Sequence, residues 1–452
     1  MSLIPQSLKP WARSLVEHGI VVGIFTLLTW VVMFGRSTLV AEQSYAGGLE
    51  HDAGTYVWYL WHLKEAVLGD GELLFSDRLF FPVGMNMVRQ DWTPITAALG
   101  LPFAGLGSIG AYNLEVLLAF VLCGTFTYML ARHLEVKRAY ALLAGMIFAY
   151  CEFRILKASY HGHLTHVNQQ FIPLYLLFAL RYFKGARVLD AVGAGVAFFL
   201  ATFCTPYQMV FLIVWSLFLV LHRFLADIFV WQVGRPGIRP GSLGPSLRRA
   251  LGFSALAGGT AVLLVMPLII AVGPRSLFLM PGALSRFQSI YSADLLSFVI
   301  PTLGKDLGWP YFSGEGGCAF QGYTVLALGA LGLFAAIRWR ASSGYWLGFG
   351  LLFFLLSLGS TLVVGGKPVT WLPFYAVIEQ IPILRHARVA SRFSSLLTLC
   401  LGLAGAIALT HAEGKWFSAW PRRKLWWARA AVLLLVGAEL LGYRARATMW
   451  LD

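Results

Sequence analysis

The sequence predicts an all-α membrane protein with many transmembrane helices, and three observations support that class. The chain has 452 residues and a mean hydropathy of +0.70. Hydrophobic residues make up 58% of it and charged residues 12%, which is about half the charged share of a typical soluble domain. Apolar runs long enough to cross a bilayer recur along the chain, and most Lys and Arg residues lie between them.

Charge distribution and cysteine content exclude two other classes. The formal net charge is +14, but no block of Lys and Arg follows a helix that would enter a nucleic-acid groove. The five cysteines show no Cys-x-x-Cys spacing, and four of them lie in apolar runs. We therefore expect no nucleic-acid partner, no disulfide framework and no cysteine zinc site.

The apolar runs predict about eleven transmembrane helices, each needing roughly 20 apolar residues or somewhat fewer. Lys9 and Arg13 precede the first span, at residues 19–35, and place the N-terminus in the cytoplasm by the positive-inside rule. The C-terminus is then expected outside. The remaining spans are expected at residues 114–131, 139–151, 171–180, 188–203, 208–222, 251–272, 323–337, 345–364, 393–411 and 425–442.

We expect a single membrane domain over residues 1–452, with no separate soluble domain. Its first extracytoplasmic loop, residues 36–112, is long and rich in acidic residues. Within this loop, residues 54–68 and 93–106 are apolar but shorter than a span, so we expect helices that lie in the membrane interface. Further outer loops are expected at residues 152–170, 273–322 and 365–392.

The first outer loop opens with an acidic motif. Glu50, His51 and Asp52 precede the predicted interfacial helix, where a carboxylate can face a cavity at the membrane surface. Sugar transfer from a lipid phosphate needs a base for the acceptor hydroxyl, and a positioned Asp or Glu contributes about 10²–10⁴-fold. We predict Asp52 and Glu50 as catalytic residues and His51 as a substrate-binding residue. Two alternatives stay open: the acids hold a divalent cation, or they are solvated loop residues.

A histidine cluster lies in the outer loop at residues 152–170. His161, His163 and His166 stand in the string YHGHLTH, shortly after Lys157. The spacing lacks the carboxylate partner of zinc proteases, so we favour hydrogen bonds to sugar or phosphate oxygens over a metal site. Solvation at the interface is the alternative. No cofactor is predicted, and a divalent metal ion is the less favoured option.

Arginines at the end of the last outer loop run against the positive-inside rule and need a local explanation. Arg385, Arg388 and Arg392 recur at helical spacing just before a span. Because guanidinium groups match phosphate geometry, we predict that they bind the phosphate of a lipid-linked donor. Contact with lipid headgroups is the alternative. Arg89, in the segment FFPVGMNMVRQDW, is a further predicted substrate-binding residue.

In the order of these features, the sequence resembles the GT-C glycosyltransferases, multi-spanning enzymes that use polyprenyl-phosphate-linked sugars on the outer face. More narrowly, it resembles a bacterial branch of GT-C-like envelope proteins whose relatives glycosylate teichoic acids and other surface polymers. The stretches that carry the resemblance are HDAGTYVWYLWHL, FPVGMN, the GHL of YHGHLTH followed by IPLY, SADLLSFVIP and LPFYAVIEQIPILRHARVASRF. Their order and spacing extend over nearly the whole chain.

The resemblance implies a GT-C-like fold in the bacterial cytoplasmic (inner) membrane, with the active site facing the periplasm or cell exterior. It implies a polyprenyl-phosphate-linked sugar donor, contact with membrane lipids, and an envelope glycan, lipid or protein as acceptor. The family's acid of the first outer loop carries over to Asp52, with Glu50 as its companion. Many members have another acid in the second outer loop, whereas here Glu152 is the only one and lies at the membrane edge. This departure favours a metal-independent mechanism.

The predicted function is a membrane glycosyltransferase in which Asp52 is the general base and Glu50 and His163 orient the substrates. The alternative from another class is a flippase or exporter of lipid-linked saccharide. Such a protein is expected to line a path with charges inside its spans, and Glu439 is the main candidate here. A catalytically inactive assembly partner with the same fold is the third hypothesis.

Overall fold

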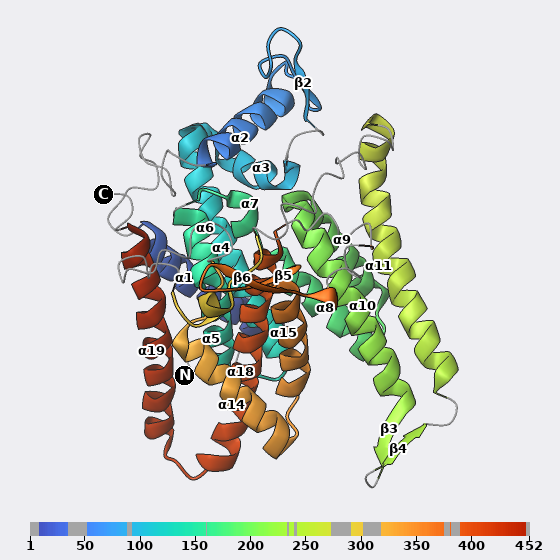
Figure 1. Cartoon of the computed structure of the whole chain (residues 1–452), viewed down its shortest axis with the longest axis vertical. Helices are drawn as coiled ribbons and strands as arrows, with labels where there is room; N and C mark the ends of the chain where they lie inside the picture. The colour runs from blue at the N-terminus through green and yellow to red at the C-terminus, as the bar shows by residue number, and fades with distance from the viewer. Residues whose placement is uncertain are drawn as a thin grey trace. The chain divides into compact units, whose positions relative to one another are not determined.

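The computed structural model describes residues 9–34, 52–87, 93–159, 161–232, 235–238, 242–272, 291–301, 318–374, 380 and 389–448. In these ranges the protein is mostly helical, with three short antiparallel hairpins (Figure 1). Two compact units emerge. The larger comprises Met1–Gly71, Thr96–Gln170 and Ala283–Asp452, and the smaller comprises Glu72–Ile95 and Phe171–Gly282.

Helices form the larger unit, together with one hairpin. Its elements are α1 (Pro10–Thr29), the π-helical turn η1 (Trp30–Phe34), α2 (Ala53–Leu68), most of α3 (Pro94–Gly100), η3 (Leu101–Leu106), α4 (Gly107–His133), α5 (Arg138–Ala149), α6 (Glu152–Ser159), α7 (Leu164–Val167), η4 (Leu295–Phe298), α14 (Tyr323–Trp339), α15 (Ser343–Ser357), β5 (Thr361–Val364), β6 (Lys367–Trp371), η7 (Ala390–Phe393), α18 (Ser394–Trp416) and α19 (Arg422–Thr448).

Helix α18 lies at the centre of the larger unit, packed against α5, α14 and α15 (Figure 1). Small residues allow this close packing. A Cβ atom on Gly405 would lie 2.6 Å from the Cβ of Leu328, and one on Gly402 would lie 3.0 Å from Ile147. Helices in a bilayer associate largely through such van der Waals contact, because lipid provides no hydrophobic driving force between them.

Two carboxylates hold the turn between α4 and α5. Glu17 of α1 pairs with Arg138 at 2.7 Å. Glu413 of α18 pairs with Lys137 at 2.8 Å and with Arg429 of α19 at 2.5 Å. Lys137 and Arg138, which lie between two apolar runs, are therefore also ionic partners of neighbouring helices. These contacts tie α1, α5, α18 and α19 together.

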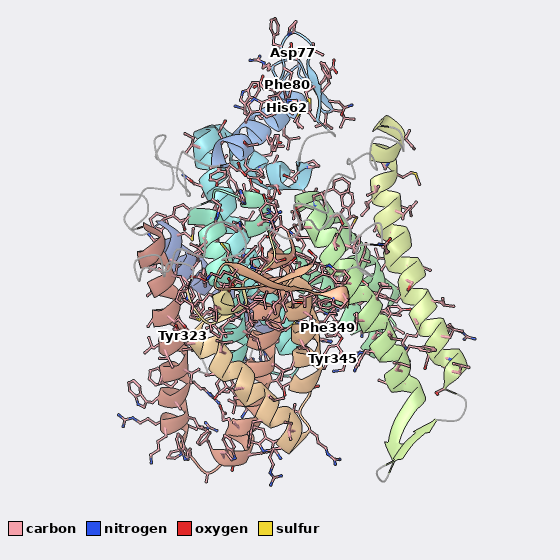
Figure 2. The ribbon with its side chains drawn as sticks, in the orientation of Figure 1. His62, Asp77, Phe80, Tyr323, Tyr345 and Phe349 are labelled. Atoms are coloured by element: carbon pink, nitrogen blue, oxygen red, sulfur yellow. The ribbon has the colours of Figure 1, made fainter. Side chains whose placement is uncertain are left out.

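Glu439 of α19 caps the N-terminus of α14. Its carboxylate accepts hydrogen bonds from the backbone nitrogens of Tyr323 at 2.6 Å and Thr324 at 3.0 Å, and from the Thr324 hydroxyl. Figure 2 shows Tyr323 at this helix start. The first N–H groups of a helix lack intrahelical acceptors and favour negative charge. The unexplained charge in the last apolar run is therefore a helix cap supplied by another helix.

The smaller unit consists of four helices and two hairpins among its described residues. Its elements are β1 (Phe75–Ser76), β2 (Met85–Asn86), α8 (Phe171–Gly185), α9 (Val188–Cys204), α10 (Pro206–Ile228), β3 (Phe229–Gln232), β4 (Arg235–Ile238) and α11 (Leu243–Val272). Thr205 alone separates α9 from α10, which begins at Pro206. The β3–β4 hairpin joins α10 to α11 (Figure 1). Gly195 of α9 lets α11 approach, since a Cβ atom there would lie 2.5 Å from the Ala257 carbonyl oxygen.

The described residues contain six helices long and apolar enough to cross a membrane, or seven if α5 and α6, bent by 45°, form one span. Three more apolar helices, α9, α14 and α15, have only 15–17 residues. At 1.5 Å per residue these cover about 22–26 Å of a hydrocarbon core roughly 30 Å thick. The protein is thus a multi-pass membrane protein, while the number of eleven spans is not confirmed. The span expected at 345–364 ends earlier, because α15 stops at Ser357 and β5 follows.

Candidate functional site

The side chains of Asp52 and His163 meet in the larger unit. Asp52 Oδ2 lies 2.6 Å from His163 Nε2, within hydrogen-bond distance, although the two residues are far apart in sequence. Asp52 occupies the N-cap position of α2, but its side chain makes no capping hydrogen bond. The positive end of the α2 dipole favours a carboxylate there. The Asp52 side chain is 60% exposed and that of His163 is 17% exposed. The carboxylate is therefore held by a largely buried imidazole while most of its own surface stays accessible.

Gly162 makes this meeting sterically feasible. It has a φ of +63°, a conformation that glycine adopts without the penalty of a Cβ atom. A Cβ atom there would lie 2.6 Å from the nitrogen and 2.7 Å from the Cβ of Ala53. The backbone nitrogen of Asp52 donates to the His161 carbonyl oxygen at 3.3 Å. One turn further along α2, the hydroxyls of Tyr56 and Thr165 lie 2.9 Å apart. The YHGHLTH segment is therefore fastened directly to the start of α2.

Residues 152–170 were predicted to form a polar outer loop, and this prediction is wrong. Most of the segment forms α6 and α7, and its side chains are largely buried. Arg154 and Lys157 are both 0% exposed, and His166 is also buried. The backbone nitrogen of His163 donates to the Lys157 carbonyl oxygen at 2.9 Å. These polar side chains therefore lie inside the protein, where the Arg154 guanidinium donates to backbone carbonyl oxygens and Lys157 Nζ lies over the Phe153 ring.

Arg154 is the buried cation that organises this segment. Its guanidinium donates to the Val167 carbonyl oxygen at 2.5 and 3.2 Å, to that of Ala149 at 2.6 Å and to that of Ala119 at 3.2 Å. It also lies over the Phe120 ring, 4.5 Å from the ring centroid. Val167 follows His166 directly, so the guanidinium holds the end of the histidine segment against α4 and α5.

A buried polar network continues from the histidine segment. Asn168 donates to Glu115 of α4 at 2.9 Å and accepts from Gln170 at 3.1 Å. Gln169 donates to the Ser395 hydroxyl at 3.2 Å, at the start of α18. Uncompensated polar groups are costly in an apolar interior, so such bonds specify how α4, α7 and α18 fit together. The network could not be predicted from the sequence, because its members carry no recognisable spacing.

The three histidines lie next to one another. The ring centroids of His161 and His163 are 5.4 Å apart, and those of His163 and His166 are 5.9 Å apart. Within the described part of the chain, no group of three or more His, Cys, Asp or Glu side chains is placed to hold a metal ion. The structural arrangement is thus a carboxylate–histidine pair with two further imidazoles beside it.

Five predicted site residues lie outside the described residues. These are Glu50, His51, Arg89, Arg385 and Arg388. Of the arginine cluster, Arg392 is described: it belongs to η7 and is 7% exposed. Its backbone carbonyl oxygen accepts from the Ser395 hydroxyl at 3.0 Å. That hydroxyl in turn accepts a hydrogen bond from Gln169, three residues after His166. A short hydrogen-bonded path therefore links Arg392 to the segment that carries His163.

Asp294, within the stretch SADLLSFVIP, is a structural carboxylate that the sequence analysis did not single out. It is buried and accepts from the backbone nitrogens of Leu296 at 2.9 Å, Gly365 at 3.1 Å and Gly366 at 2.6 Å. Both glycines have positive φ, as the tight turn of the β5–β6 hairpin requires. Asp294 therefore fixes this hairpin to η4. The residues around Asp294 in the sequence do not indicate that the glycine turn is its partner.

Comparison with known proteins supports the fold. No protein-family model and no curated protein sequence matches the chain. Among solved structures, the archaeal oligosaccharyltransferase AglB from Archaeoglobus fulgidus, in complex with an inhibitory peptide and a dolichol-phosphate, matches with a TM-score of 0.54 and 13% identity over 96% of this chain. The Archaeoglobus fulgidus oligosaccharyltransferase tethered to an acceptor peptide matches with a TM-score of 0.52 and 14% identity over 97% of this chain.

Both matches cover 56% of the neighbour's chain, so this protein corresponds to little more than half of their length. At this identity the likeness concerns the fold alone. The chain shares the fold of these oligosaccharyltransferases, which agrees with the GT-C-like fold that the sequence resemblance implied. The narrower bacterial branch stays a prediction.

Proposed function

We propose that the protein is a membrane glycosyltransferase that moves a sugar from a polyprenyl-phosphate-linked donor to an extracytoplasmic envelope acceptor, with Asp52 as general base. The fold is shared with oligosaccharyltransferases, one of which was solved with dolichol-phosphate. The observation that carries the proposal is the pair formed by Asp52 and His163 at 2.6 Å.

The geometry of this pair suits a general base. His163 holds one carboxylate oxygen of Asp52, which sets the direction of the carboxylate before the acceptor arrives. The exposure of the Asp52 side chain leaves room for an acceptor hydroxyl. In the proposed step, Asp52 takes the hydroxyl proton while the hydroxyl oxygen bonds to the anomeric carbon of the donor sugar. The bond from that carbon to the phosphate oxygen breaks, and its electron pair leaves on the phosphate.

The leaving phosphate needs positive charge, and we assign that role to Arg388 and Arg392. Arg392 is buried directly before α18. Lys157, His161 and His166 belong to the same segment as His163 and are proposed to contact the donor or acceptor. No divalent metal ion is assigned a step in this mechanism.

The flippase hypothesis loses its main sequence argument. Glu439, the charge considered for a hydrophilic path, is engaged as a cap of α14. Glu115 is a further buried carboxylate in a membrane helix, and it is bonded to Asn168. Both carboxylates therefore hold helices or segments together, so the transferase remains the preferred function.

The test is a transfer assay with purified protein in lipid nanodiscs. Native mass spectrometry first identifies the co-purified lipid-linked sugar, and its radiolabelled form then serves as donor for an envelope acceptor fraction. Asp52→Asn is expected to lower transfer by about 10²–10⁴-fold, the usual contribution of a general base. The matched control is Asp77→Asn, which alters an exposed acid of the first outer loop (Figure 2) and should leave transfer unchanged.

Three results would count against the proposal. Full transfer by Asp52→Asn, with correct folding, would remove Asp52 as the base. Translocation of a fluorescent lipid-linked sugar across vesicles without a new glycosidic bond would favour a flippase. Absence of transfer by the wild-type chain with every lipid-linked donor tried would favour an inactive assembly partner.

A further inference from the structure

Helices α10 and α11 of the smaller unit form the walls of an apolar groove of about 600 Å³. Leu217 and Val220 of α10 and Ala261 of α11 are among the residues that line it. At its base, the hydroxyl of Tyr175 lies 2.6 Å from that of Ser216, so these two polar groups satisfy each other. The groove follows α11 from residue 247 to 262, about 22 Å at 1.5 Å per residue. That exceeds one leaflet of a hydrocarbon core roughly 30 Å thick.

A second furrow of about 490 Å³ follows the neighbouring face of α11. Leu247 and Leu251 line both the groove and this furrow, and both side chains are exposed. Because they line both, these two leucines separate the groove from the furrow, and we call them the leucine ridge. Two adjacent channels separated by one ridge match the two acyl chains of a phospholipid, whereas a single-chain lipid would occupy only one of them.

Positive charge gathers at the end of the leucine ridge where α10 and α11 are joined. The two helices carry three arginines and one aspartate. Asp227 is paired with Arg249 at 3.3 Å. Arg248 lines the second furrow and is exposed, and no described residue forms an ion pair with it. Arg223 has a buried Nε without a hydrogen-bond partner among the described residues. Arg223 and Arg248 can thus interact with an anionic group that is not part of the protein.

We propose that α10 and α11 bind one anionic phospholipid. Its acyl chains lie on the two sides of the leucine ridge, and its phosphate is held at Arg248, with Arg223 adding positive potential. Basic pockets between membrane helices select anionic headgroups in this way. A zwitterionic phosphatidylcholine carries no net charge to balance the arginines. The site does not depend on the proposed glycosyl transfer.

Native mass spectrometry of the full-length protein tests this site. The protein is released from nanodiscs that contain equal amounts of phosphatidylglycerol and phosphatidylcholine with identical acyl chains. Phosphatidylglycerol is expected to be retained in preference. Arg248→Gln should weaken that retention about fivefold, the equivalent of roughly 1 kcal/mol per basic residue at a membrane surface, without changing retention of phosphatidylcholine. The matched control is Arg338→Gln, which alters an exposed arginine at the end of α14.

A second pair of variants tests the channels. Ser254→Trp places a large ring in the groove, and Ala255→Trp places one in the second furrow. Each should reduce lipid retention while the thermal unfolding midpoint stays within a few degrees of wild type. If either Trp variant unfolds, the corresponding Leu variant replaces it. Equal retention of the two lipids, equal loss with Arg338→Gln, or a polyprenyl phosphate in place of the phospholipid would each overturn the proposal.

Discussion

Gly162 lies so close to Ala53 that a Cβ atom on Gly162 would be 2.6 Å from the Ala53 backbone nitrogen. This contact brings together two segments that are more than a hundred residues apart in the chain. One segment carries Asp52 at the start of α2, and the other carries His163 immediately after the glycine. The candidate base and its partner therefore depend on a position that has no side chain.

Gly162→Ala is expected to separate these two segments. Its left-handed backbone costs a residue with a Cβ atom about 1–2 kcal/mol, and the contact with Ala53 adds to that cost. We expect a large loss of sugar transfer and a lowered thermal unfolding midpoint. Gly54→Ala is the control, because a Cβ atom there meets nothing within 4 Å and alanine favours the helix by about 0.5–1 kcal/mol. Wild-type transfer by Gly162→Ala would contradict the role given to this contact.

His163 is expected to act as a positioning residue for Asp52. His163→Leu removes the donor that lies 2.6 Å from the carboxylate, and misplacement of a catalytic group typically costs about 10²-fold. The loss should appear in kcat more than in KM, since acceptor binding is not removed. His163→Gln offers a side-chain N–H in a similar place and should recover most of the rate. Equal losses in both variants would point to a different function for the imidazole.

Arg154 is expected to be required for stability. Arg154→Lys keeps the positive charge but cannot reach the carbonyl oxygens of Val167, Ala149 and Ala119 together, because an ammonium lacks the planar fork of a guanidinium. Hydrogen bonds to charged groups contribute about 1.5–3 kcal/mol each, so the unfolding midpoint in detergent should fall by several degrees. Arg338→Lys, at an exposed position, should unfold like the wild type. An unchanged midpoint for Arg154→Lys would show that water replaces the lost bonds.

Asp294→Asn is expected to loosen the β5–β6 hairpin locally. The carboxylate uses both oxygens to accept from Leu296, Gly365 and Gly366, and an amide presents one oxygen and an N–H₂ group that cannot accept. A hydrogen bond to a charged group contributes about 1.5–3 kcal/mol, so its loss should speed hydrogen exchange at Gly365 and Gly366 by about tenfold or more. Asp77→Asn serves as the control. Unaltered exchange at the two glycines would mean that Asp294 does not hold the turn.

The helices could largely be predicted from the sequence because apolar runs and their breaks are local properties. The start of α2 at Ala53, the end of α9 before Pro206 and the placement of α18 all follow from such patterns. The number of spans could not be predicted equally well. Short apolar helices such as α15 have the composition of a span without its length, and neighbouring helices rather than lipid surround part of their surface.

In the candidate site, too, the residues could be predicted from the sequence but their contacts could not. Asp52 was singled out by its place after the first span, and His163 by its place in a histidine cluster. Their contact could not be inferred from either segment alone, because it depends on the backbone of Gly162 and on the anchoring of Val167 by Arg154. The segment at 152–170 was expected to be a polar outer loop, because composition does not reveal which partners a polar group will find.

The sequence by itself determined that this protein is a helical membrane protein and where most of its helices begin and end. It also indicated which polar stretches are candidates for a functional site. Hydropathy and helix breakers act within a few turns, so they can be read without the fold. Tertiary structure alone decided which polar groups meet. Glu439 caps a helix more than a hundred residues away, Asp294 holds a distant glycine turn, and Asp52 faces His163. Burial makes the pairing of Asp294 strongly preferred over leaving its carboxylate unpaired, and the backbone N–H groups at the start of α14 favour the Glu439 carboxylate.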